Sequence, residues 1–113
     1  MEVFCRTQFE AFHSWDDAPD EVAFLRKNHR HIFHVELTVE VDHDDRDVEF
    51  ILMKRALEEY IEECLAHRDY SCEQYAKSIA RWGANTYDQP TRCTVSEDGE
   101  NGARVSAKPG DGQ

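Results

Sequence analysis

The sequence predicts an α+β fold, in which an antiparallel four-stranded sheet carries two helices on one face. Two observations point to this class. Apolar and polar residues alternate in segments toward both ends of the chain, as in strands with one buried face. Between these segments, apolar residues recur at steps of three and four, as in amphipathic helices. The order is therefore strand, strand, helix, helix, strand, strand, and two hairpins around a helix pair favour one sheet covered on one side.

The first predicted strand spans residues 3–13, which are rich in aromatic and β-forming residues. Because side chains alternate across a strand, every second residue shares a face. One face of this strand is expected to hold Phe9, Ala11 and His13. Residues 14–28 then form a connection that contains a short helix, for which Pro19 suits the first position.

The second predicted strand, His29 to Val41, has the clearest pattern in the sequence. Apolar residues occupy every second position from Phe33 onward, and polar residues lie between them. This alternation indicates a strand with one buried and one solvated face. Extended toward the N-terminus, the apolar face includes His31 and His29, so two histidines are expected on the interior side of the strand.

Two helices are expected next. The first covers roughly residues 47–66, where apolar side chains recur at helical spacing. Ser71 has the character of an N-cap, and Gln74 lies at the position that completes a capping box. We expect the second helix to begin there and to end near residues 83–85, where a glycine is followed by an asparagine.

A last hairpin closes the predicted sheet. Residues 91–97 alternate again, 98–102 have the composition of a turn, and 103–107 form the returning strand. We expect one domain over residues 1–107 and a flexible tail over 108–113, because the tail has no apolar anchor. One face of the strand before the turn is expected to hold Cys93, Val95 and Glu97.

Composition excludes some classes of partner. The chain has 113 residues, with 24 Asp and Glu against 13 Lys and Arg, and a formal net charge of −11. Binding to nucleic acid needs clustered Lys and Arg, so we expect neither a nucleic-acid partner nor an anionic membrane surface. No apolar run approaches the roughly 20 residues of a membrane-spanning helix. The four cysteines include no C-x-x-C pair, and we expect free thiols in a reducing, cytoplasmic compartment.

The histidines offer a candidate metal site. His29 and His31 lie two residues apart on a strand, so their imidazoles point the same way, and His13 on the neighbouring strand can supply a third. Three imidazoles leave one tetrahedral position open, as in catalytic zinc sites, where the ion acts as a Lewis acid. The alternative interpretation of the spacing alone is a polar strand end without a metal.

Five short motifs occur in order along the chain. They are Phe-Glu-Ala-Phe-His (9–13), His-Arg-His (29–31), Val-Glu-Phe (48–50), Ser-Cys-Glu (71–73) and Val-Ser-Glu (95–97). This series resembles the 6-pyruvoyltetrahydropterin synthase and 6-carboxytetrahydropterin synthase family, which shows Phe-x-Ala-x-His, His-Gly-His, Asp-Phe, Thr-Ser-Glu and Glu-Thr. The similarity covers most of residues 4–105, and the order of strands and helices matches the family's tunnelling fold.

The resemblance implies specific roles. His13, His29 and His31 match the family's zinc ligands, and Glu97 matches the carboxylate that anchors the amino-pyrimidine edge of a pterin by bidentate pairing. The alternative for Glu97 is an ordinary glutamate at a strand end. The resemblance also implies a homo-oligomer whose sheets join edge to edge, with sites at subunit interfaces. Such joining covers the open edges of a small sheet.

Part of the family's proton-transfer machinery is missing. The family has a catalytic cysteine shortly before His-Gly-His, but residues 14–28 contain none, and its Leu-Asp-His is Leu-Ala-His here. His67, the last residue of that motif, is the candidate catalytic acid or base, because imidazole titrates near neutral pH. The alternative for His67 is an exposed histidine at a helix end. Other residues considered for the place of the thiol are Asp20, Glu21 and Cys72.

Two functions are compatible with this pattern. The first is a zinc-dependent pterin lyase that acts on 7,8-dihydroneopterin triphosphate or a related pterin, with 6-carboxytetrahydropterin as the expected product on a queuosine-type deazapurine pathway. The second is a zinc-binding relative that binds a pterin, a purine or a protein without turnover, which the missing Cys and Asp favour. The net charge opposes a triphosphate, so Arg26, Lys27 and Arg30 are expected to compensate locally.

Overall fold

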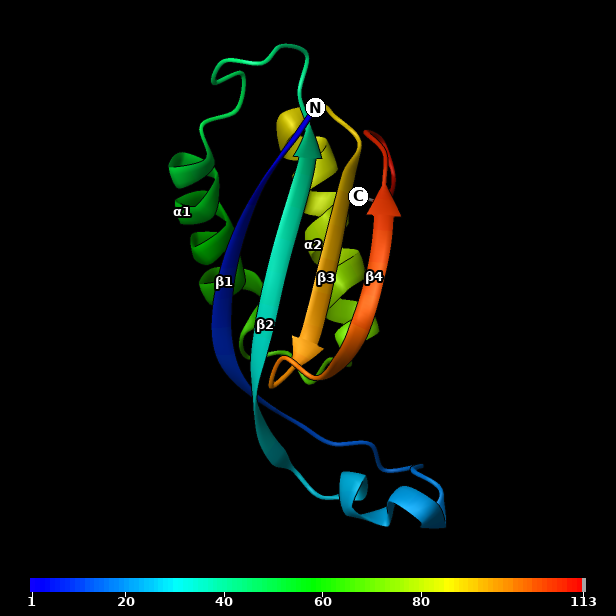
Figure 1. Ribbon diagram of the computed structural model, residues 1–113. Helices are drawn as coiled ribbons and strands as arrows, with labels where there is room; N and C mark the ends of the chain where they lie inside the picture. The colour runs from blue at the N-terminus through cyan, green and yellow to red at the C-terminus, as the bar shows by residue number, and fades with distance from the viewer. Residues whose placement is uncertain (113) are drawn as a thin grey trace.

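The computed structural model describes residues 1–112 and confirms the predicted α+β class. Four strands form one antiparallel sheet in the order β1-β2-β3-β4, and both helices lie on the same face of it (Figure 1). The elements are β1 (Glu2–His13), the short 3-10 helix η1 (Asp20–Arg26), β2 (His29–Glu40), α1 (Phe50–Tyr60), the π-helical turn η2 (Ile61–Leu65), α2 (Cys72–Tyr87), β3 (Thr91–Glu97) and β4 (Asn101–Ala107). No helix of the described residues is long and apolar enough to cross a membrane.

The strands differ in length, which gives the molecule an elongated form. β1 and β2 pair along twelve residues each, whereas β2 pairs with β3 only from Phe33 to Val39. The N-terminal end of β2 therefore extends beyond the β3–β4 turn together with the end of β1, and η1 lies at the tip of this extension (Figure 1). Residues 29–31 thus lie in the two-stranded extension, where β3 does not cover them.

The alternation predicted for the second strand is confirmed from Phe33 to Leu37, whereas Thr38 on the expected solvated face is also buried, and the strand ends at Glu40 rather than Val41. Phe33, Val35, Leu37 and Val39 are buried against the helices, at most 2 % exposed. Burying four such side chains stabilises the fold by several kcal/mol, about 1.5–3 kcal/mol for each. The two helices complete the core with buried side chains, which are Met53 and Leu57 of α1 and Tyr75 and Ile79 of α2.

The helix boundaries were predicted in part. The first helix begins at Phe50 rather than near 47, and Glu49 caps it by accepting a hydrogen bond from the backbone N–H of Ile51. The predicted capping box of the second helix is confirmed: Ser71 Oγ accepts from Gln74 N at 3.2 Å, and Gln74 Oε1 accepts from Ser71 N at 3.0 Å. This box fixes the start of α2, which lies beside the histidines.

The predicted end of the second helix was wrong. The helix continues through Gly83 to Tyr87, and Asp88 ends it in the left-handed region at φ 53°. Gly83 serves packing instead, because a Cβ atom there would lie 3.2 Å from Leu37 Cδ1 and 3.4 Å from Thr91 Cγ2. The glycine therefore brings α2 close to the sheet rather than ending the helix.

The residues that follow β4 form hydrogen bonds with one side chain of α2. Asn85 accepts a hydrogen bond from Gly110 N at 2.7 Å and donates one to the carbonyl of Asp111 at 3.1 Å. The flexibility expected for residues 108–113 stays a prediction, and Gln113 lies outside the described residues.

Candidate metal centre

The structure brings the three predicted histidines together. His13 faces His29 directly across the β1–β2 pair, and Ala11 faces His31, so the three rings share one face of the two-stranded extension. The ring centroids are 4.4 to 5.2 Å apart. One ligating atom from each residue lies within 4.8 Å of the other two. The group is partly buried and can hold a metal ion.

Each imidazole is held through its Nδ1 atom. His13 Nδ1 lies 3.0 Å from the carbonyl oxygen of Tyr70, and His29 Nδ1 lies 2.7 Å from that of Lys27. His31 Nδ1 lies 2.9 Å from a carboxylate oxygen of Asp98. Because these oxygens accept, each Nδ1 donates, and the neutral ring then carries a lone pair at Nε2. Metal-binding histidines are oriented in this way by an acceptor on the second ring nitrogen.

Asp98 is a supporting residue that the sequence analysis missed. It follows Glu97 in the β3–β4 turn, where its φ of 55° places it in the left-handed region. Its pKa is held below the ordinary value of 3.8, first by the hydrogen bond from His31 and then by one from the backbone N–H of Ile32. The carboxylate of Asp98 accepts from His31 Nδ1 and thereby fixes the tautomer of that ring. An Asp-Gly pair in a turn was its only signal in the sequence.

The Nε2 atoms fit a metal ion. Those of His13 and His29 are buried and have no hydrogen-bond partner within residues 1–112. A buried polar atom left without a partner costs about 1–3 kcal/mol, which a cation at this point would offset. Three imidazole nitrogens are a donor set that suits zinc.

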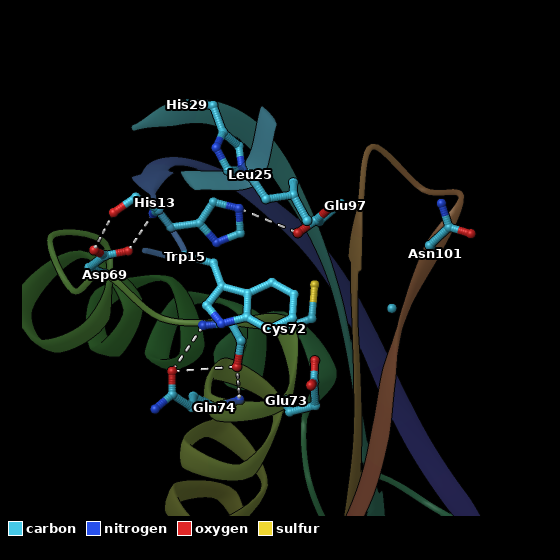
Figure 2. A pocket seen from close by; sticks show the side chains of 13 residues that line it. His13, Trp15, Leu25, His29, Asp69, Cys72, Glu73, Gln74, Glu97 and Asn101 are labelled. Atoms are coloured by element: carbon cyan, nitrogen blue, oxygen red, sulfur yellow. Dashed lines mark hydrogen bonds and ion pairs between the residues drawn. The ribbon is translucent and has the colours of Figure 1, made fainter. Parts of the chain in front are cut away.

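A cavity of about 580 Å³ opens beside the histidines, which is a typical size for a small-molecule site. The end of β1, the N-terminus of α2 and the β3–β4 turn surround it, as Figure 2 shows. Its lining consists of His13, Ser14, Trp15, Leu25, His29, Asp69, Ser71, Cys72, Glu73, Gln74, Glu97, Asn101 and Gly102.

Glu97 lies where the sequence analysis expected a functional carboxylate. It points from the end of β3 toward His13 (Figure 2), with Oε1 3.4 Å from His13 Nε2 and Oε2 3.6 Å from His31 Nε2. The carboxylate therefore lies beside two of the three histidines and also lines the cavity. Whether it anchors a pterin stays a prediction.

The structure does not bring His67 to this site. His67 follows η2 as an exposed residue, and its Nε2 lies 3.3 Å from the carbonyl oxygen of Glu63. Within the described chain, the cavity lining contains Asp69 in its place. Asp69 accepts hydrogen bonds from the backbone N–H of Ser14 at 2.8 Å and from its hydroxyl at 3.2 Å. Neither Asp69 nor Trp15 was singled out from the sequence.

Two of the three expected basic residues are engaged in ion pairs outside the cavity. Arg26 lies 2.8 Å from Asp20, and Arg30 lies 3.1 Å from Glu10. None of the described residues lining the cavity is Lys or Arg. Within one chain, these side chains therefore do not offset the negative charge of a triphosphate in the cavity. Asp20, a candidate to replace the missing catalytic thiol, instead forms an ion pair with Arg26.

Cys72 lines the cavity but is not an activated thiol. Burial raises its pKa from 9.0 to about 12, and the charges of Glu97 and Glu73 add to the shift. The helix N-terminus, which lowers the pKa of a thiol, is outweighed at this position. Burial also raises the pKa of Cys5 to about 11 and increases that of Cys93. All three residues therefore remain protonated thiols near neutral pH.

These shifts predict the reactivity of the four thiols. At about pH 8, a pKa of about 11 or 12 leaves roughly one Cys5 thiol in a thousand and one Cys72 thiol in ten thousand ionised. Because only the thiolate reacts, we expect a disulfide reagent to label one group per folded chain, the exposed Cys64, and all four after denaturation. Absorbance of the released thiol measures both counts. Cys64→Ser should abolish the fast reaction, and rapid labelling in that variant would contradict the assignment.

No protein-family model matches the chain, and no curated protein matches it. The residues of the site are therefore the basis for inferring a function.

Proposed function

We propose that the protein binds zinc through His13, His29 and His31 and acts as a pterin lyase on 7,8-dihydroneopterin triphosphate or a related pterin. The observation that carries this proposal is the convergence of three imidazoles, each held at Nδ1, on one point beside the cavity. Two of the three Nε2 atoms are buried without a partner in the described chain. When bound, zinc supplies Lewis-acid chemistry that makes a substrate hydroxyl a stronger acid.

The cavity offers groups that suit a flat heterocycle bearing N–H donors. Trp15 provides an aromatic surface in the cavity (Figure 2), and aromatic rings stack in offset or edge arrangements. The Glu97 carboxylate can accept two N–H groups from the edge of an aminopyrimidine ring. Asp69 is held by Ser14 at the cavity wall and can accept a proton there. These residues would bind and orient the ring beside the histidines.

A homo-oligomer forms part of this proposal. β1 and β4 are the edge strands of the sheet, and open edges favour pairing with another chain. Exposed aromatic side chains, among them Phe4, Phe12 and Phe24, are each more than half exposed in the single chain. In such an assembly, the exposed His67 would serve the site of a neighbouring subunit as an acid or base.

The second candidate function is the binding of zinc and a ligand without turnover. For both candidate functions, we propose a cytoplasmic location. One observation favours it specifically: residues 14–28 contain no cysteine, and Cys72, the thiol among the described residues lining the cavity, lies instead at the start of α2 and is buried, which raises its pKa. The lyase family's thiolate therefore has no counterpart in the cavity of the single chain. Binding without turnover needs only the three histidines and Glu97.

Incubation with substrate separates the two functions. Zinc-loaded protein is mixed with 7,8-dihydroneopterin triphosphate, and the pterins are analysed by liquid chromatography and mass spectrometry. We expect a new pterin, 6-carboxytetrahydropterin, from the wild type and none from His31→Ala. Tight pterin binding without a product would instead support the second function. Neither binding nor product would refute the assignment to pterins.

A further inference from the structure

We propose that Asp69 is a positioning residue of the cavity, which acts through Ser14 to hold Trp15 where the ring of a planar ligand stacks on it. The inference rests on the proposed function, because it concerns the same cavity, and it adds how a flat heterocycle is held there. It does not depend on the metal ion or on the protonation of the histidines. Three observations support it.

The first observation is that Asp69 holds one residue with both oxygens of its carboxylate. Oδ1 accepts a hydrogen bond from the backbone N–H of Ser14 at 2.8 Å, and Oδ2 accepts one from the Ser14 hydroxyl at 3.2 Å. Hydrogen bonds to a charged acceptor are stronger than those between neutral groups. Asp69 lies between η2 and α2, 55 residues from Ser14 along the chain, so the pair joins two distant segments of the cavity wall.

The second observation is that the backbone of Trp15 is paired on both of its polar groups. Trp15 N donates a hydrogen bond to the carbonyl of Leu25 at 2.7 Å, and Ala18 N donates one to the carbonyl of Trp15 at 3.1 Å. Ser14 directly precedes Trp15, so its bonds to the carboxylate restrain the chain just before the indole. Loss of the carboxylate would remove this restraint and leave the backbone bonds in place.

The third observation is that the ring of Trp15 is available to a ligand. Its side chain lines the cavity (Figure 2), the residue is 51 % exposed, and within residues 1–112 it forms no pair with another aromatic ring. The other tryptophan, Trp82, is stacked on Tyr60, with ring centroids 4.9 Å apart and an interplanar angle of 8°. Trp82 therefore has its stacking partner within the fold, whereas Trp15 leaves aromatic surface available in the cavity.

These features favour a planar heterocycle as the ligand. Aromatic side chains attract flat rings through offset stacking, and loss of an aromatic residue that stacks on a nucleic-acid base weakens binding about 5–150-fold. Gln74, Glu97 and Asn101 line the same cavity and offer hydrogen-bonding groups to the edges of such a ring. Stacking on Trp15 thus supplies affinity for flat rings in general, and the polar groups select among them.

A positioning role for Asp69 differs from that of a proton acceptor in the effect of asparagine. In Asp69→Asn, the side-chain oxygen can still accept from the backbone N–H of Ser14, and the amide can donate to the oxygen of the Ser14 hydroxyl. The contact with Ser14 is then kept although the basic group is lost. Asp69→Asn should therefore hold Trp15 in place, whereas Asp69→Ala should release it.

Binding of neopterin, a pterin without phosphate groups, to the zinc-loaded full-length protein tests this inference. Isothermal titration calorimetry gives the dissociation constant for each variant. We expect Trp15→Ala to weaken binding about 5–150-fold and Asp69→Ala at least about fivefold, while Asp69→Asn stays within about threefold of the wild type. Circular dichroism verifies that each variant is folded.

Two matched controls remove the same kinds of side chain outside the cavity. Trp82→Phe removes the other tryptophan, and Asp111→Ala removes an exposed carboxylate that also accepts a backbone hydrogen bond, from Lys108 N at 2.8 Å. Neither residue lines the cavity within the described chain. Both variants should keep the dissociation constant for neopterin within about threefold of the wild type.

The fluorescence of Trp15 provides a second readout, which needs no ligand. The chain has two tryptophans, so Trp82→Phe leaves Trp15 as the only one. In this background, we expect Asp69→Ala to lower the fluorescence anisotropy of Trp15, because the side chain then moves more freely on the nanosecond timescale. Asp69→Asn should keep the anisotropy of the parent protein.

Each result decides one point. Equal neopterin affinity of Trp15→Ala and the wild type would overturn the stacking role and leave the proposed function intact. Unchanged anisotropy of Trp15 in Asp69→Ala would overturn the positioning role. Equal losses of affinity in Asp69→Asn and Asp69→Ala would also overturn it, because the charge or basicity of Asp69 would then be the cause. No neopterin binding by the wild type would overturn the inference, and no binding of the triphosphate either would refute the proposed function itself.

Discussion

The double variant His29→Ala/His31→Ala is expected to lose stoichiometric zinc, from about one ion per chain to less than about 0.1. Two of the three imidazoles would be gone, and the remaining groups are too few for a tetrahedral site. Structural zinc sites with four protein ligands bind with about 10–16 kcal/mol, or roughly 2.5–4 kcal/mol for each ligand, so losing two ligands weakens binding by at least about 10³-fold. Elemental analysis after gel filtration measures the ion content.

The matched control for this variant removes two other histidines. His34 lies on the same strand but on the opposite face, in register with Gln8 and Ser96, and His43 lies in the exposed loop before α1. His34→Ala/His43→Ala should retain zinc at the wild-type level. If zinc stoichiometry were unchanged in His29→Ala/His31→Ala, the proposed site would be wrong.

Phe33→Ala is expected to cost about 3–5 kcal/mol of the free energy of unfolding, as for other buried phenylalanines. Phe33 is fully buried, and its ring lies 5.3 Å from that of Phe9 and 5.0 Å from that of Tyr75. The ring centroid of His13 is 5.4 Å from that of Phe33, so Phe33 also packs against one of the three histidines. Because small domains are stable by only about 5–15 kcal/mol, the variant should be near the limit of folding.

Urea denaturation at one fixed protein concentration measures this effect, since association would shift the apparent stability. Phe50→Ala is the control, because that side chain is 54 % exposed and lies on α1 rather than on an edge strand. It should change stability by no more than about 0.5 kcal/mol. A similar loss in the free energy of unfolding for both variants would show that the burial of Phe33 is not the reason for its effect on stability.

Periodicity predicted most of the fold because it reports burial directly. The alternation from Phe33 to Val39 placed β2 with its apolar face toward the helices, and the capping box at Ser71 placed the start of α2. The end of α2 was not predictable from local signals. Gly83 is typical of a helix terminus in sequence, yet here it allows close contact with Leu37, a residue far away along the chain.

The histidine cluster was predictable, whereas the groups that orient it were not. The spacing of His29 and His31 fixes their common face, and an antiparallel neighbour can supply His13. Two of the three orienting acceptors are the carbonyl oxygens of Lys27 and Tyr70. Every residue has such an oxygen, so sequence contains no signal for it. The third is the side chain of Asp98, whose orientation depends on a turn conformation that only the fold defines.

The register of His13 with His29 has a topological consequence. These two residues bracket residues 14–28, an excursion of 15 residues whose helix η1 buries no side chain. A metal ion bound by both imidazoles would join the two ends of this excursion, as a cross-link does. A covalent cross-link around a loop of similar length stabilises the folded state by about 3 kcal/mol, because it lowers the conformational entropy of the unfolded chain. Such a cross-link at the base of the excursion would add to its internal hydrogen bonds, among them the one from Trp15 N to the carbonyl of Leu25 at 2.7 Å.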